Sequence, residues 1–229
     1  MGIRKALRRL LSRAERQRAR DVATANVFLS VSDGGRLLLS HDLPDGAVVL
    51  DVGGYLGDWT AAMARRYPAR YLVFEPVPTF AERMRVRFSD LAGIEVHAYG
   101  LAAQDGHIDI ALLGDATSAF RGAAQTVQVA LRDYRQVLDQ AGIVRVDLMA
   151  INAEGAEFDL LETMIATNDL IRFDRLMIQF HRVVDQADSR RAAIQAALAQ
   201  SHEKVFDFPF CWELWRRRRE ILDVPETTR

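Results

Sequence analysis

The order of apolar and polar positions predicts strands that alternate with helices along most of the chain. Short apolar runs indicate buried strands, and apolar residues three and four apart indicate helices. The predicted strands are 47–51, 70–75, 94–98, 107–113, 126–132, 144–151, 175–180, 204–208 and 211–215. The predicted helices are 58–67, 79–90 with Thr79 as N-cap, 133–140, 156–166 and 189–200. This alternation favours an α/β fold, with a mostly parallel sheet, helices on both faces and a closing antiparallel strand pair.

The segment before the turn signal at 44–46 reads as a helical N-terminal extension, residues 1–43, followed by one domain over 44–229. Residues 3–20 place a narrow apolar stripe on one helical face and arginines around the rest, and a second helix is predicted over 21–30. We favour a helix that packs this stripe on the domain or on a partner subunit. Peripheral contact with a membrane surface is the alternative.

Composition narrows the class of protein. A length of 229 residues fits a single domain, and 49% hydrophobic with 27% charged residues is typical of a globular fold. The net charge of −1 gives no overall attraction to nucleic acid, so we expect no nucleic-acid partner. Cys211 is the only cysteine, and no apolar run is long enough to span a bilayer. The basic N-terminus lacks the apolar core of a secretory signal, and we expect a cytoplasmic protein.

A glycine-rich loop, Asp51-Val-Gly-Gly-Tyr-Leu-Gly57, follows the first buried strand and precedes a helix. Glycines in this position let the backbone turn sharply and approach a ligand closely. The next strand ends in Glu75, where an acid can accept both hydrogen bonds from a ribose diol.

The spacing within this loop discriminates between cofactors. A dinucleotide fingerprint requires G-x-G-x-x-G, but Val52 stands two residues before Gly54. Asp51 would face a pyrophosphate unfavourably, whereas it suits the cationic amino group of a methionine moiety. The loop therefore favours S-adenosylmethionine, with a nicotinamide-dependent oxidoreductase as the alternative.

Two predicted neighbouring strands end in polar groups, Asn152 to Glu154 and His181. Because ligands in open α/β sheets bind outside the carboxyl ends of strands, these groups are expected to converge on one pocket. Glu154 and His181 are the candidate catalytic bases. The alternatives are a helix-capping role for Glu154 and a structural role for His181; Glu157 is expected on a helix face. The small, polar segment 114–121 is a candidate acceptor-side loop.

Ordered blocks over residues 47–215 resemble the FkbM-type methyltransferase family. Besides the glycine-rich loop and the Phe-Glu-Pro sequence that ends at Pro76, these blocks are 99–106, 146–162, 178–181 and 212–214. The resemblance implies a Rossmann-like, class I methyltransferase that uses S-adenosylmethionine. It also implies O-methylation of a hydroxyl on a sugar, glycan or secondary metabolite, and thus a small-molecule or glycan acceptor. A non-catalytic binding module with the same fold is the second alternative, and a homo-oligomer is compatible with the sequence.

Position by position, the resemblance implies that the methionine end of the cofactor contacts Asp51, Gly53 and Gly57, and the ribose contacts Glu75. On the adenine side it implies Gly100, Leu101 and Asp105, and Asn152 is counted with the cofactor-binding residues. The chain departs from the family at Tyr55, where Asn is common, and at Asn152, where Asp is common. An amide in place of a carboxylate weakens any metal proposal, so we expect no metal.

Overall fold

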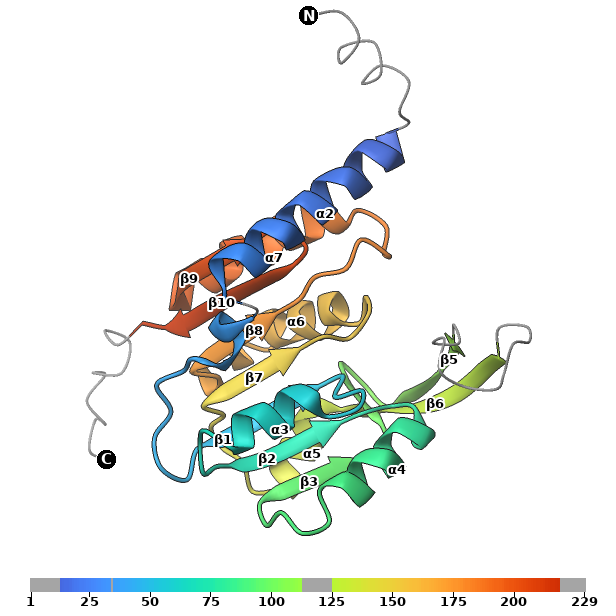
Figure 1. Cartoon of the computed structure of the whole chain (residues 1–229), viewed down its shortest axis with the longest axis vertical. Helices are drawn as coiled ribbons and strands as arrows, with labels where there is room; N and C mark the ends of the chain where they lie inside the picture. Colours follow the sequence, from blue (N-terminus) through green and yellow to red (C-terminus); the bar gives the residue numbers. More distant parts are fainter. Residues whose placement is uncertain (1–12, 34, 113–124, 219–229) are drawn as a thin grey trace, which may run out of the picture.

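The computed structural model describes residues 13–33, 35–112 and 125–218. Its centre is a seven-stranded sheet in the order β3-β2-β1-β7-β8-β10-β9 (Figure 1). The strands are β1 (Val48–Val52), β2 (Arg70–Phe74), β3 (Ile94–His97), β7 (Leu148–Ile151), β8 (Arg175–Ile178), β9 (His202–Phe208) and β10 (Trp212–Arg217). The first five strands in that order pair in parallel, and β10 pairs antiparallel with both β8 and β9. The predicted sheet, including its closing antiparallel pair, is confirmed.

Helices cover both faces of this sheet (Figure 1). One face carries α2 (Arg13–Val31), η1 (Arg36–Leu39), α3 (Asp58–Ala64) and α4 (Pro78–Arg87). The other carries α5 (Tyr134–Gln140), α6 (Glu157–Ala166) and α7 (Ala187–Ser201), with η2 (Asp169–Arg172) after α6. Successive side chains of a strand point to opposite faces, so Leu50 packs with α5 to α7 while Val49 packs with Met63 of α3. The predicted three-layer α/β architecture is confirmed.

A second, three-stranded sheet projects beyond the carboxyl edge of the main one (Figure 1). It consists of β4 (Gly100–Ala102), β5 (Gly106–Leu112) and β6 (Gln125–Asp133), in the order β4-β6-β5. The sequence did not predict β4, because three residues are too few for a periodicity. Gly100 of β4 packs closely on β6, because a Cβ there would stand 2.7 Å from the Leu131 side chain. The candidate acceptor-side loop at 114–121 lies outside the described residues.

Two local predictions need correction. Thr79 is not the N-cap of α4: the cap is Val77, and Pro78 is the first helical residue, where its fixed φ is already helical. The helix predicted over 21–30 is part of one longer helix, α2, and residues 1–12 lie outside the described part.

α2 lies against the domain along β9, with the Phe28 ring 5.1 Å from the Phe208 ring. Arg182 reinforces this contact by donating a 3.2 Å hydrogen bond to Asp21. Within the described ranges, no helix has the length and apolar character needed to cross a membrane.

Candidate functional site

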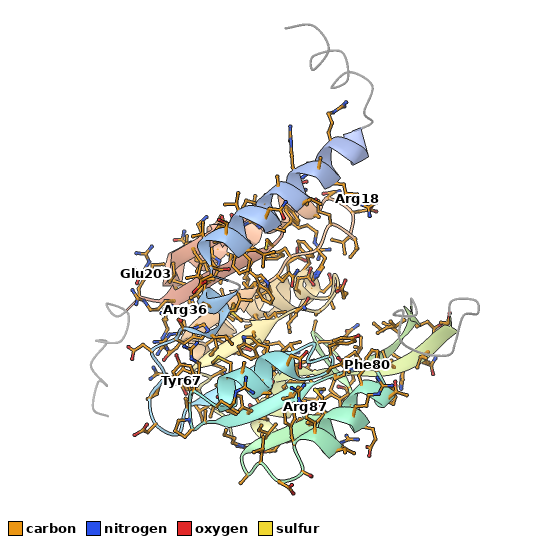
Figure 2. The ribbon with its side chains drawn as sticks, viewed as in Figure 1. Arg18, Arg36, Tyr67, Phe80, Arg87 and Glu203 are labelled. Carbon is orange, nitrogen blue, oxygen red and sulfur yellow. The ribbon has the colours of Figure 1, made fainter. Side chains whose placement is uncertain are left out.

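Most of the predicted site residues, all but the three assigned to the adenine side, collect at the carboxyl ends of four adjacent strands. In the order β2-β1-β7-β8, these strands lead into Glu75, the glycine-rich loop, Asn152 and His181. Phe80, labelled in Figure 2, belongs to the α4 turn beside the same edge. The topology therefore brings together residues that are separated by more than a hundred positions in the sequence.

Gly53 holds the loop after β1 directly against the loop after β7. Its φ is +89°, and a Cβ there would stand 1.9 Å from the backbone oxygen of Asn152. The backbone N–H of Asn152 in turn donates to Val52 O at 2.8 Å. Gly57, with φ +78°, has the Phe88 ring in the position that a Cβ would take. Both glycines are thus required by close packing as well as by backbone conformation.

Glu75 is held in place by the backbone of the loops around it. The side chain is buried; Oε2 accepts a 2.8 Å hydrogen bond from Tyr55 N, and Oε1 accepts a 2.9 Å bond from Val77 N. Burial raises the pKa of this carboxyl above its ordinary value, although the two N–H groups oppose that shift. Each oxygen has a second lone pair, so this fixed carboxylate can accept from two ribose hydroxyls.

Tyr55, the first departure from the family pattern, keeps its contact through the backbone. Its N–H bonds Glu75, and that bond does not depend on the side chain. The residue has φ +50°, a left-handed conformation that Asn adopts more readily than Tyr. Its ring packs edge-on against Phe80, with the ring centroids 4.7 Å apart.

Asp51 is a buried carboxylate with an uncharged partner. It is 6% exposed, and Oδ2 accepts a 2.5 Å hydrogen bond from Thr60 Oγ1. Burial raises the pKa of Asp51 to about 6, against the opposing effect of the Thr60 bond. In the described part of the chain, the buried Asn152 Oδ1 also lacks a hydrogen-bond donor. A carboxylate and an orphaned amide oxygen both fit the ammonium group of a methionine moiety.

The structure brings both candidate bases together around a third residue, Glu157. His181 Nδ1 lies 3.2 Å from Glu157 Oε1, and His181 Nε2 lies 3.6 Å from Glu154 Oε1. Glu157 Oε1 also accepts from the His181 backbone N–H at 2.8 Å, and Oε2 accepts from Gly155 N at 2.7 Å. The histidine is therefore oriented by a fully buried carboxylate that is itself fixed from two sides.

Sequence reasoning placed Glu157 on a helix face and missed this role. Glu157 is the first residue of α6, and its side chain turns back into the protein. Glu157 Oε2 also accepts from Gly155 N just ahead of the helix, which is the capping role that the sequence suggested for Glu154. Glu154 makes no such cap; its side chain is 79% exposed and its φ is +48°. The Glu-Gly-Ala-Glu spacing, with its second acid at the helix start, was the available signal.

The pKa of His181 is raised above its usual value. Burial alone would lower it, but the hydrogen bond and charge of Glu157 and the charge of Glu154 outweigh burial. The described residues include no cluster of three His, Cys, Asp or Glu side chains suited to a metal ion, and the absence of a metal stays a prediction.

The three residues assigned to the adenine side have structural partners. Leu101 is 2% exposed and packs within the main core. Asp105 accepts from Asp133 N at 2.8 Å and from Arg132 Nη1 at 3.0 Å, which lowers the pKa of its carboxyl. These bonds join the β4–β5 turn to β6. Cofactor contact at Gly100, Leu101 and Asp105 stays a prediction.

A fold of this class, with a glycine-rich loop after β1 and an acid after β2, defines a nucleoside-binding α/β protein. The family model described as Methyltransferase FkbM domain matches residues 51–208, which is more than half of the chain. The chain therefore belongs to the FkbM methyltransferase family, as its sequence blocks predicted. S-adenosylmethionine is the cofactor that this family implies, and the ribose and ammonium acceptors described above fit it.

Two curated relatives are similar to the chain over part of their length. "Methyltransferase 1" of Beauveria bassiana (strain ARSEF 2860) is 28% identical over 145 residues, covering 52% of this chain and 58% of that protein. The AMB antimetabolite synthetase AmbE of Pseudomonas aeruginosa is 25% identical over 206 residues, covering 70% of this chain and 10% of that protein. The chain thus spans about half of the first relative's length and a small part of the second.

Solved structures with a similar fold are distant. An rRNA methylase from Streptococcus thermophilus is 13% identical, with a TM-score of 0.45, covering 80% of this chain and 93% of that one. Precorrin-6y C5,15-methyltransferase from Geobacter metallireducens GS-15 is 12% identical, with a TM-score of 0.44, covering 81% of this chain and 88% of that one. Similarity at this level carries no argument about the acceptor of this protein.

Proposed function

We propose that this protein transfers a methyl group from S-adenosylmethionine to a hydroxyl oxygen of a small-molecule or glycan acceptor. Family membership supports the methyl transfer. The observation that supports the acceptor chemistry is His181, oriented by buried Glu157 at the carboxyl edge of the sheet. An aliphatic hydroxyl is a poor nucleophile, so a positioned base is the feature that an O-methyltransferase needs.

The cofactor supplies a methyl group already activated by a sulfonium. Glu75 would accept hydrogen bonds from the ribose of the bound cofactor, and Asp51 with Asn152 would accept them from its ammonium group. The glycine-rich loop lets the backbone approach the methionine moiety because Gly53 and Gly57 carry no side chain. Together these residues fix the methyl carbon relative to the acceptor, and alignment supplies much of the rate enhancement.

His181 acts as the base in this proposal. The Glu157 carboxylate accepts from Nδ1–H and so fixes the tautomer that leaves a lone pair on Nε2. Bound S-adenosylmethionine would supply the methyl group to the acceptor oxygen and leave as S-adenosylhomocysteine, and Nε2 would take the hydroxyl proton. Glu154, exposed and 3.6 Å from Nε2, is placed to contact the acceptor and to stabilise the protonated ring. Glu157 is a positioning residue, because it acts through His181.

Calorimetric titration with S-adenosylhomocysteine tests the cofactor, and turnover on a panel of sugars, glycans and phenols tests the acceptor. His181→Asn and Glu154→Gln should each leave S-adenosylhomocysteine affinity within about 1 kcal/mol of wild type. The variant that removes the catalytic base, His181→Asn in this proposal, should lose ~10²-fold in kcat. Binding of NADH in place of S-adenosylhomocysteine would support the oxidoreductase instead. Methylation of amines but not of hydroxyls would overturn the O-methyl assignment.

The role of Glu157 has its own readout. Its replacement in Glu157→Gln should lower kcat and lower the pKa seen in the kcat profile, because the neutral amide no longer raises the pKa of His181. Glu162→Gln, on the same helix but paired with Arg190, is the matched control and should leave the profile unchanged. Identical profiles for both variants would assign Glu157 a purely structural role.

A further inference from the structure

A pocket of about 380 Å³ lies between α3, α4 and the amino-terminal ends of β2 and β3. We call it the α3–α4 pocket. Ala64, Phe88 and Leu91 contribute to its largely apolar wall, and Arg65 and Arg87 also line it. Ala64 is the last residue of α3 and Arg65 follows it, so the pocket lies toward the opposite end of that helix from the glycine-rich loop. Its volume is at the lower end of the range for small-molecule sites.

The charged side chains that line the α3–α4 pocket are all positive. Two guanidinium groups line the pocket and no carboxylate does. Among the described residues, the Arg65 guanidinium has no hydrogen-bond or ion-pair partner, so it is available to an incoming anion. Arg87, labelled in Figure 2 near α3 and α4, is the second cation of the lining, and its Nη1 is already paired with Asp58 Oδ1 at 2.6 Å. An apolar cavity with one guanidinium available, and a second that must exchange Asp58 for the ligand, selects a ligand with an apolar body and an anionic head.

We infer that the α3–α4 pocket binds a small amphipathic carboxylate. Its hydrocarbon or aromatic body packs between Ala64, Phe88 and Leu91, and its carboxylate pairs with Arg65 and Arg87. Guanidinium groups suit this head because their planar forks bind carboxylates through two parallel hydrogen bonds. The site is distinct from the methyl-transfer site, and binding there does not depend on the proposed function.

The same pocket residues also contact the glycine-rich loop. Arg87 Nη1 donates to Leu56 O and to Asp58 Oδ1, both at 2.6 Å. The Phe88 ring occupies the space next to Gly57. A carboxylate that draws Arg87 toward Arg65 removes the donor from Leu56 O and loosens the loop. Occupancy of the pocket therefore lowers affinity for S-adenosylhomocysteine, a consequence that rests on the proposed function.

Titration of the full chain with sodium octanoate, without cofactor, tests the pocket itself. Arg65→Ala should weaken octanoate binding about tenfold or more through loss of a charge-assisted pair. Arg83→Ala is the matched control: Arg83 lies exposed on α4 outside the pocket, and its loss should leave affinity unchanged. Octylamine, with the same chain and the opposite charge, should bind at least tenfold more weakly. Equal octanoate affinity in both variants, or equal affinity for both ligands, would overturn the site.

A substitution that fills the α3–α4 pocket provides a second test. Ala64→Phe should abolish octanoate binding while circular dichroism and S-adenosylhomocysteine affinity stay close to wild type. Octanoate binding retained in this folded variant would place the ligand elsewhere.

Coupling is measured by titrating S-adenosylhomocysteine with the pocket saturated by octanoate. The dissociation constant should rise three- to tenfold, and S-adenosylhomocysteine should weaken octanoate by the same factor, because linkage is reciprocal. An unchanged constant would overturn the coupling. Failure of S-adenosylhomocysteine to bind the free protein would instead overturn the proposed function, and the octanoate titrations would still decide the pocket.

Discussion

Lowering the pH should weaken S-adenosylhomocysteine binding because Asp51 takes up a proton. The carboxyl is buried, its one hydrogen-bond donor among the described residues is the Thr60 hydroxyl, and burial raises its pKa to about 6. In the proposed complex, the cofactor ammonium pairs with the ionised carboxylate. Binding must then displace a proton wherever the free protein is protonated, and affinity rises with pH up to about 6 and levels off above it.

The size of the effect follows from that pKa. A carboxyl with a pKa of about 6 is roughly 90% protonated at pH 5 and almost fully ionised at pH 7.5, so affinity should fall about tenfold between these values. The rise from the ordinary 3.8 to about 6 corresponds to about 3 kcal/mol. In the free protein this raised pKa stabilises the fold below pH 3.8, and that contribution is lost as the pH rises through 6.

Calorimetry at pH 5, 6 and 7.5, in buffers of different ionisation enthalpy, gives both the affinity and the protons released. Asp51→Asn should bind S-adenosylhomocysteine more weakly at pH 7.5 and remove most of the pH dependence. Glu75→Gln is the necessary comparison, because burial also raises the pKa of Glu75. If wild type and Asp51→Asn show the same pH dependence, Asp51 does not hold the ammonium group.

Three further predictions concern the cofactor loop and the N-terminus. Glu75→Ala should weaken S-adenosylhomocysteine binding by about 1.5–3 kcal/mol and lower the melting temperature, since two backbone N–H groups lose their acceptor; unchanged affinity would contradict the ribose assignment. Gly53→Val should abolish binding and destabilise the fold by about 1–3 kcal/mol, because its Cβ meets the backbone oxygen of Asn152; normal melting and binding would refute that packing. Deleting residues 1–20 should leave affinity within about 1 kcal/mol, since Phe28 and its packing remain; lost binding in a folded truncation would move the domain boundary.

Local pattern was sufficient for most of the secondary structure and for the cofactor loop. The run 47–51 predicted β1 because a strand buried on both faces is continuously apolar. Gly53, Gly57 and Glu75 could be selected from spacing alone, since the turn and the acid that ends the next strand belong to one short unit. Thr79 was misassigned as a cap because Pro78 fills the first helical position, a competition between two adjacent signals.

By itself, the sequence determined the alternation of strands and helices, the glycine-rich turn and the acid after the second strand, because each depends on residues within a few positions. Only the tertiary structure decided that Asn152 O would face Gly53, that Glu157 would turn inward to orient His181, and that β4 would pair with β6. Those contacts depend on which strands become neighbours. Strand order is set by burial and pairing over the whole sheet, which no local periodicity encodes.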